Sequence, residues 1–188
     1  MIERPAAVVK ELVENAIDAG ARAISVSLAD GGKSEIIVED DGCGMGPADL
    51  LLAIERHATS KLRDDPAGEI DLTHIATLGF RGEALPSIGA VARLDLAARR
   101  AGDREGAILS VHGGVVDGPR PAGFAGRGAR VVVRDLFFAT PARLKFLKGE
   151  RAEQQAAVDI VRRLAMAHPA IAFSFFSDGR RLFHYPAE

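Results

Sequence analysis

The chain has 188 residues, of which 47% are hydrophobic and 27% charged, and its formal net charge is -2 at pH 7. These proportions describe a folded globular domain and exclude a disordered or strongly basic protein. Charged residues interrupt every apolar run well before the roughly 18 residues that a membrane span needs, and no signal peptide precedes residues 2–5. We therefore expect one cytoplasmic domain without a membrane contact.

Cysteine and histidine usage argues against a disulfide or a structural zinc site. Cys43 is the only cysteine, and the five histidines never approach the paired spacing of zinc ligands. The 24 basic and 26 acidic residues leave no overall basic excess. A contact with nucleic acid therefore requires a local patch or another part of the protein.

The first predicted element is an amphipathic helix that includes KELVENAIDAGAR, residues 10–22. Its apolar residues gather on one stripe and its acidic and amide residues on another, while Pro5 suits its first turn and Gly20 a left-handed C-terminal cap. A solvated polar face is the ordinary explanation. However, Glu11 and Asn15 are four residues apart, so a base and a metal-ligating amide can also converge on one bound group.

The later elements are predicted from periodicity and turn residues. A hairpin over 22–28 and 35–39 precedes a glycine-rich stretch at 40–46, and helices follow at 47–58 and up to Val91. Further strands are expected at 93–99, 107–112 and 129–136, with a long flexible connection at 113–128, a helix at 151–167 and a hairpin at 171–176 and 181–185. Such blocks predict a two-layer α/β sandwich.

The sequence Asp40-x-Gly42-x-Gly44 admits two interpretations. Aspartate and glycine are common in ordinary turns. Alternatively, the Asp40 carboxylate accepts a hydrogen bond from an exocyclic amine such as adenine N6, whereas the carbonyl of guanine would repel it. The two glycines would then let the backbone approach the base without a Cβ atom.

Two further stretches suit phosphate. The glycine-rich turn of residues 78–85 opens a helix, where free backbone N–H groups and the helix dipole favour an anion, although a loop with a helix cap is the alternative. Residues 56–61 add hydroxyls and a cation after a helix, which an ordinary polar helix end also explains.

In this order the motifs resemble the GHKL ATPases and, within them, the MutL mismatch-repair family. Other GHKL members, such as type II topoisomerases and sensor histidine kinases, share only the Glu-x-x-x-Asn helix and the Asp-x-Gly-x-Gly loop. The resemblance spans essentially the whole chain and implies the GHKL (Bergerat) ATP-binding fold, a mixed, mostly antiparallel sheet with helices on one face. The discriminating stretches are residues 11–21, 40–45, 56–61, 78–85 and 135–143.

The resemblance implies a role for each matching residue. Glu11 takes the place of the general base that activates water, Asn15 that of the Mg²⁺ ligand, and Asp40 that of the adenine contact. Glu14 and Asp18 receive no such role and are expected to be surface or supporting residues. The other implied ATP contacts are Gly42, Gly44, Met45, Thr59, Lys61, Gly79, Phe80, Arg81, Gly82, Glu83, Ala84 and Leu85.

The chain departs from the family at two positions and at both ends. Gly128-Ala129 stands where a Gly-Thr pair usually supports the adenine site, so Arg130 or a water is expected to replace the hydroxyl, or binding to be weaker. Ala139 stands where asparagine is common. The family also has a short N-terminal arm and a following transducer domain, so residues 1–188 are expected to be one GHKL ATPase lobe without either.

The resemblance implies an ATP-operated switch, in which nucleotide closes a lid, favours self-dimerisation and links mismatch detection to strand removal. Its implied partners are a mismatch-recognition protein and DNA, and its implied location is the cytoplasm, at the nucleoid. A non-catalytic nucleotide-binding or protein-interaction module is the alternative. A basic run in the second half is either a solvated helix face or a DNA-facing patch; it comprises Arg143, Lys145, Lys148, Arg151, Arg162 and Arg163.

Overall fold

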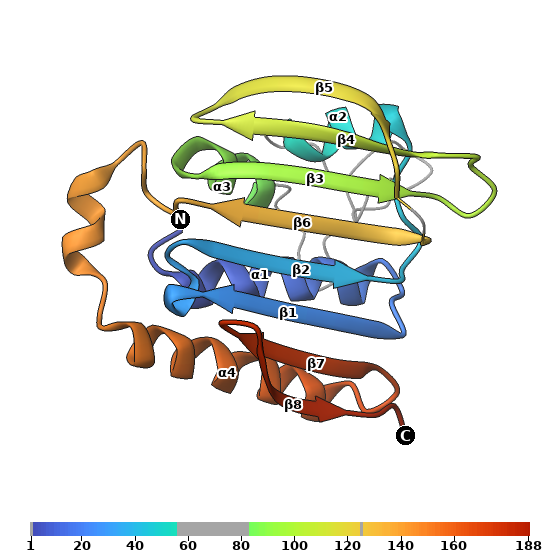
Figure 1. Cartoon of the computed structure of the whole chain (residues 1–188). Coiled ribbons are helices and arrows are strands. Elements are labelled where there is room, and N and C mark those ends of the chain that lie inside the picture. The colour runs from blue at the N-terminus through green and yellow to red at the C-terminus, as the bar shows by residue number, and fades with distance from the viewer. Residues whose placement is uncertain (1, 56–82, 125) are drawn as a thin grey trace, which may run out of the picture.

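Helices cover one face of an eight-stranded sheet in the computed structural model, which describes residues 2–55, 83–124 and 126–188 (Figure 1). The strands lie in the order β5-β4-β3-β6-β2-β1-β7-β8. Neighbouring strands are antiparallel except β1 and β7, which are parallel. The predicted two-layer sandwich with a mixed, mostly antiparallel sheet is confirmed.

The elements follow the predicted order closely. In the described ranges the helices are α1 (Pro5–Asp18), α2 (Pro47–Ile54), α3 (Ala84–Val91) and α4 (Glu150–Ala167), with short 3-10 turns η1 (Asp30–Gly32) and η2 (Pro141–Phe146). The strands are β1 (Ala23–Ala29), β2 (Glu35–Asp40), β3 (Arg93–Arg99), β4 (Gly106–His112), β5 (Val115–Ala122), β6 (Gly128–Arg134), β7 (Ala172–Ser177) and β8 (Arg180–Tyr185). Within these ranges, no helix combines the length and the apolarity that crossing a bilayer requires.

The flexible connection expected at 113–128 is wrong, because half of it forms strand β5, paired antiparallel with β4. Gly113 and Gly114 make the turn between the two strands, with φ of 58° and 86°. Pro119 and Pro121 lack an N–H donor, but β5 is an edge strand and needs donors only on its inner side. The glycine and proline content therefore predicted a loop where the structure has an exposed strand. The two prolines are compatible with its position at the edge of the sheet.

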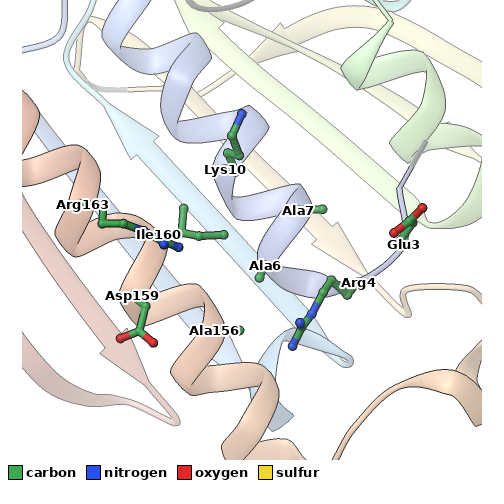
Figure 2. A pocket seen from close by; sticks show the side chains of 9 residues that line it. All are labelled: Glu3, Arg4, Ala6, Ala7, Lys10, Ala156, Asp159, Ile160 and Arg163. Atoms are coloured by element: carbon green, nitrogen blue, oxygen red, sulfur yellow. The ribbon is translucent and has the colours of Figure 1, made fainter.

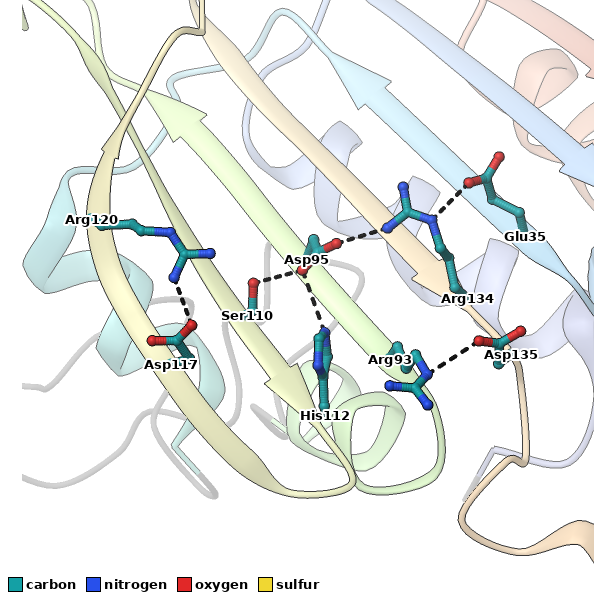
Figure 3. Close-up of polar contacts among 9 residues, drawn as sticks. All are labelled: Glu35, Arg93, Asp95, Ser110, His112, Asp117, Arg120, Arg134 and Asp135. Atoms are coloured by element: carbon teal, nitrogen blue, oxygen red, sulfur yellow. Dashed lines mark hydrogen bonds and ion pairs between the residues drawn. The ribbon is translucent and has the colours of Figure 1, made fainter.

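The alternation of the strands separates an apolar face from a polar one. On β3, Leu94 and Leu96 are fully buried under the helices, while Asp95 lies on the opposite face. There the Arg134 guanidinium donates to Glu35 Oε2 at 3.0 Å and to Asp95 Oδ2 at 2.8 Å (Figure 3). This row of ion pairs crosses β2, β6 and β3 on the face away from the helices.

Helices α1 and α4 are joined by a buried carboxylate. Glu153 of α4 is 1% exposed and pairs with the half-exposed Arg4, whose Nε lies 3.0 Å from Glu153 Oε2. The other oxygen of Glu153 accepts the backbone N–H of Lys148 at 2.9 Å. Both oxygens are thus satisfied, and the start of α1 is fixed against α4.

Glu153→Ala is expected to lower the free energy of unfolding by roughly 1.5–3 kcal/mol, because it leaves the Lys148 N–H and the Arg4 guanidinium without their acceptor. Urea unfolding measures the change. The matched control is Asp159→Ala, an exposed carboxylate on the same helix that is bonded to Gln155 and is expected to shift stability by no more than about 0.5 kcal/mol. Equal effects of the two substitutions would contradict the role given to Glu153.

Candidate functional site

Helix α1 presents two carboxylates in different environments. Its apolar stripe is buried against the sheet, with Val9 and Leu12 at most 2% exposed, and its predicted start at Pro5 and left-handed Gly20 are both confirmed. Glu11 is half-buried and makes no side-chain hydrogen bond or ion pair in the part of the chain that the structure describes. Its carboxylate is therefore available to a water or a ligand.

Glu14 is already neutralised by the protein. The residue is buried at 8% exposure, and Lys10 Nζ, one turn earlier on the same helix, lies 2.7 Å from Glu14 Oε1. The expectation that Glu14 supports the helix agrees with this ion pair, whereas a surface position does not. Asn15 and Asp18 are half-buried like Glu11, and both make polar contacts.

Asp40 ends β2 on the helix-covered face. It continues the inward alternation of Ile36 and Val38, so it belongs to the same layer as α1. Burial raises the pKa of its carboxyl, while the backbone N–H groups of Gly42 and Ala129 oppose the rise. The Gly42 N–H donates to Asp40 Oδ1 at 2.8 Å, and no cation pairs with Asp40 among the described residues. A desolvated carboxylate of this kind is a strong acceptor for an N–H of a ligand.

The glycines after Asp40 are required by packing within the protein. A Cβ on Gly42 would lie 2.8 Å from both the Cβ and the carbonyl oxygen of Ala19 at the end of α1. Gly44 has φ of 69°, and a Cβ there would collide with the carbonyl of Arg99. The loop is thus fixed between α1 and β3, and the expected approach of a base to these glycines stays a prediction.

Ala129 supports Asp40 through its backbone. The two residues are paired in the β2–β6 ladder, and the N–H of Ala129 favours the charged carboxyl. The expectation that Arg130 replaces the missing hydroxyl is wrong, because the next residue along a strand faces the other side of the sheet. Arg130 Nε lies there, 2.9 Å from Glu39 Oε1.

The predicted phosphate-binding residues are only partly described. Glu83 precedes α3, and the N–H groups of Ala84 and Leu85 belong to its first turn, where an α-helix leaves its N–H groups unpaired. Met45 is half-buried and packs against the core. Thr59, Lys61, Gly79, Phe80, Arg81 and Gly82 lie outside the described residues.

A cleft of about 410 Å³ between α1 and α4 lies apart from these residues (Figure 2). Neither Glu11, Asn15 nor Asp40 lines it. Two of its cations, Arg4 and Lys10, are already paired with Glu153 and Glu14. The candidate site is therefore the layer between α1, the end of β2 and the start of α3.

The oxygen atoms of the described residues suit a metal ion that is held mainly by a bound molecule and only in part by the protein. Among the described residues no group of three or more His, Cys, Asp or Glu side chains is arranged to hold a metal ion. The amide oxygen of Asn15 is a hard donor of the kind that Mg²⁺ accepts, and Mg²⁺ is commonly held by one or two protein oxygens together with phosphate oxygens. Asn15 therefore fits a metal that arrives with a nucleotide.

A family model described as histidine kinase-, DNA gyrase B- and HSP90-like ATPase matches residues 3–112. The chain belongs to this ATPase family. The matched region contains α1, the Asp40 loop and α3, which carry every predicted site residue that the structure describes.

Relatives within this ATPase family are mismatch repair proteins. The chain is 61% identical over 181 residues to DNA mismatch repair protein MutL of Rhodospirillum rubrum, a match that covers 96% of this chain and 28% of that protein. It is 58% identical over 188 residues to the MutL protein of Paramagnetospirillum magneticum, covering 100% of this chain and 30% of that one. The chain thus spans less than a third of the length of these curated relatives.

Solved MutL structures have the same fold. The Aquifex aeolicus MutL ATPase domain complexed with ADP aligns with a TM-score of 0.82 and 32% sequence identity, over 100% of this chain and 65% of that one. Another structure of that domain aligns with a TM-score of 0.76 and 31% identity, over 100% of this chain and 62% of that one. The resemblance to the MutL ATPase domain predicted from the motifs is confirmed.

Asp41 is a feature of the site that the motif did not reveal. Its carboxylate accepts two backbone N–H groups at the start of β1, and its carbonyl accepts the side chain of Arg127. The sequence shows two adjacent aspartates and assigns a role only to the first. The spacing of the motif separates Asp40 from Asp41, but nothing in it indicates what Asp41 binds.

Proposed function

We propose that the protein binds ATP on the helix-covered face of the sheet and hydrolyses it with Mg²⁺, as the ATPase lobe of a MutL-like mismatch repair protein. The observation that supports this most is that Glu11, which has no partner among the described residues, and the desolvated Asp40 lie in one layer. The overall fold is shared with the Aquifex aeolicus MutL ATPase domain complexed with ADP, which also supports the proposal.

Asp40 selects the base in this proposal. Its carboxylate accepts a hydrogen bond from the adenine amine. A guanine carbonyl at the same place is itself an acceptor and would be repelled by the carboxylate. Gly42, Gly44 and Met45 line the base. The phosphates are held by Thr59, Lys61, Gly79, Phe80, Arg81, Gly82, Glu83, Ala84 and Leu85.

Glu11 acts as the general base. The water that attacks the γ-phosphate must lose a proton, and the Glu11 carboxylate, which has no partner among the described residues, can take it. Asn15 would hold Mg²⁺, and the ion would supply positive charge that neutralises the phosphates. Glu14 cannot replace Glu11, because Lys10 already occupies its carboxylate.

The whole protein then works as a switch. Residues 1–188 form one lobe, flanked by a short N-terminal arm and a transducer domain, and ATP-driven closure of the lid favours a self-dimer. The dimer communicates with a mismatch-recognition protein and DNA at the nucleoid. The length of the relatives supports this proposal, since the chain covers only 28% and 30% of two MutL proteins.

The 188-residue chain is expected to bind a non-hydrolysable ATP analogue weakly, to remain mostly monomeric and to turn over ATP negligibly, because closure needs the flanking segments. A chain extended at both ends should bind tightly and hydrolyse ATP. Calorimetry and a phosphate-release assay on both chains test this. Strong, concentration-independent turnover by the 188-residue chain would show that the flanking segments are dispensable. Absence of nucleotide binding by both chains would favour the alternative, a protein-interaction module.

A further inference from the structure

Two segments of the chain converge on Asp41, directly after the end of β2, one on its side chain and one on its backbone. The Asp41 Oδ1 atom accepts the backbone N–H of Arg22 at 2.7 Å and that of Ala23 at 2.9 Å. Both hydrogen bonds end on the same oxygen. The carboxylate therefore fixes the end of β2 to the start of β1 at a point where the ladder pairing stops.

The backbone after Asp41 is held by the segment that leads into β6. Arg127 donates to the Asp41 carbonyl, which belongs to the Asp41–Gly42 peptide, through Nε at 3.2 Å and through Nη2 at 3.1 Å. The next residue, Gly128, has φ of 115°, and a Cβ there would collide with the carbonyl of Asp40 and lie 2.9 Å from Asp41 Cα. The backbone on either side of Asp41 therefore has little freedom to rotate.

The two neighbouring carboxyls differ in their electrostatics. Burial disfavours the charge of Asp41, but the N–H groups of Ala23 and Arg22 and the positive charge of Arg127 outweigh it and lower the pKa. Asp40 has a raised pKa, to which the negative charge of Asp41 adds slightly. Asp41 thus stays charged and bound to the protein, while Asp40 is left for a ligand.

We propose that Asp41 is a positioning residue that sets the direction of the Asp40 carboxylate and thereby the preference of the site for an adenine base. This rests on the proposed function, in which Asp40 accepts the adenine amine. The Asp41 carboxylate is engaged by the N–H groups of Arg22 and Ala23, so it is given no contact with the base. It acts by holding the backbone next to the Cα atom from which the Asp40 side chain projects.

The test compares Asp41→Ala with Asp41→Asn in the chain extended at both ends. Alanine removes the acceptor, whereas the amide oxygen of asparagine can accept the same two N–H groups without the charge. Calorimetry with non-hydrolysable ATP and GTP analogues gives the affinity for each base on the same triphosphate. Asp41→Ala is expected to weaken binding of the ATP analogue roughly tenfold to a hundredfold and binding of the GTP analogue only slightly. Asp41→Asn is expected to keep the selectivity for ATP over GTP within about threefold of the parent.

A merely structural role would lower the melting temperature and weaken both analogues equally, and this result would overturn the proposal. Equal loss in the alanine and asparagine variants would overturn it too, because the acceptor would not be the cause. Should Asp41→Ala fail to fold, Arg127→Met leaves the Asp41 side chain intact and removes both donors to its carbonyl. That variant is expected to lose ATP selectivity roughly threefold to tenfold, and unchanged selectivity would count against the inference.

Failure of this inference is distinguishable from failure of the proposed function. Asp40→Asn serves as the reference variant in the same calorimetric series. Undiminished ATP affinity in Asp40→Asn contradicts the proposed base contact. Lost affinity in Asp40→Asn with unchanged selectivity in Asp41→Ala contradicts only the positioning role of Asp41.

Discussion

Glu11→Ala, in the chain extended at both ends, is expected to cut ATP turnover by roughly 10²–10⁴ while leaving ATP affinity near normal. The reason is that the Glu11 carboxylate has no partner among the described residues and is half-buried on the side of α1 that belongs to the candidate site. Removing a general base affects the transition state and leaves the bound nucleotide in place. Single-turnover hydrolysis measured alongside equilibrium binding separates the two quantities.

Glu14→Ala is the matched control, because it removes the same charge from the same helix three residues later. Its carboxylate is paired with Lys10, so its loss is expected to change turnover only a few-fold, through helix stability or the local field. A larger loss of turnover in Glu14→Ala than in Glu11→Ala would mean that the register of α1 and the roles assigned to its polar face are wrong.

The sequence predicted those features that depend on local periodicity. The start of α1 at Pro5 and its left-handed Gly20 follow from rules that act within a few residues. The hairpin of β1 and β2 was equally local, because alternation and turn residues stand next to each other in the chain. The parallel pairing of β1 with β7 joins residues about 150 positions apart, and no local pattern specifies it.

The site was harder to predict than the fold, because its distinctions depend on partners distant in sequence. The ion pair of Lys10 with Glu14 is the local exception, because the two residues are four apart on α1. The polar contacts of Asp41 with Arg22 and Arg127 join segments 19 and 86 residues away, which are invisible to motif reading. Composition likewise misjudged β5, since its glycines and prolines are typical of loops and are tolerated only because the strand lies at the edge.

Asp40→Asn is expected to abolish measurable ATP binding and at the same time to stabilise the domain at neutral pH. Asparagine can still accept the Gly42 N–H, but it then presents its own N–H groups to the adenine amine, a donor facing a donor. The loss is about 1–3 kcal/mol or more in a desolvated site. Calorimetry with a non-hydrolysable ATP analogue in the chain extended at both ends measures it.

The stability gain follows from the sign of the pKa shift. Burial raises the pKa of the Asp40 carboxyl above its ordinary value, so the folded state binds the proton more tightly than the unfolded state. The resulting stabilisation is complete below the unfolded pKa and is lost as the pH rises through the folded pKa, which leaves a buried charge at neutral pH. Asparagine carries no charge, so thermal unfolding should occur at a higher temperature than in the parent chain at pH 7, with the difference shrinking as the pH falls below the folded pKa. A mutant that is less stable than the parent at pH 7 would contradict the desolvation of Asp40, and one that keeps its affinity for ATP would contradict the base contact.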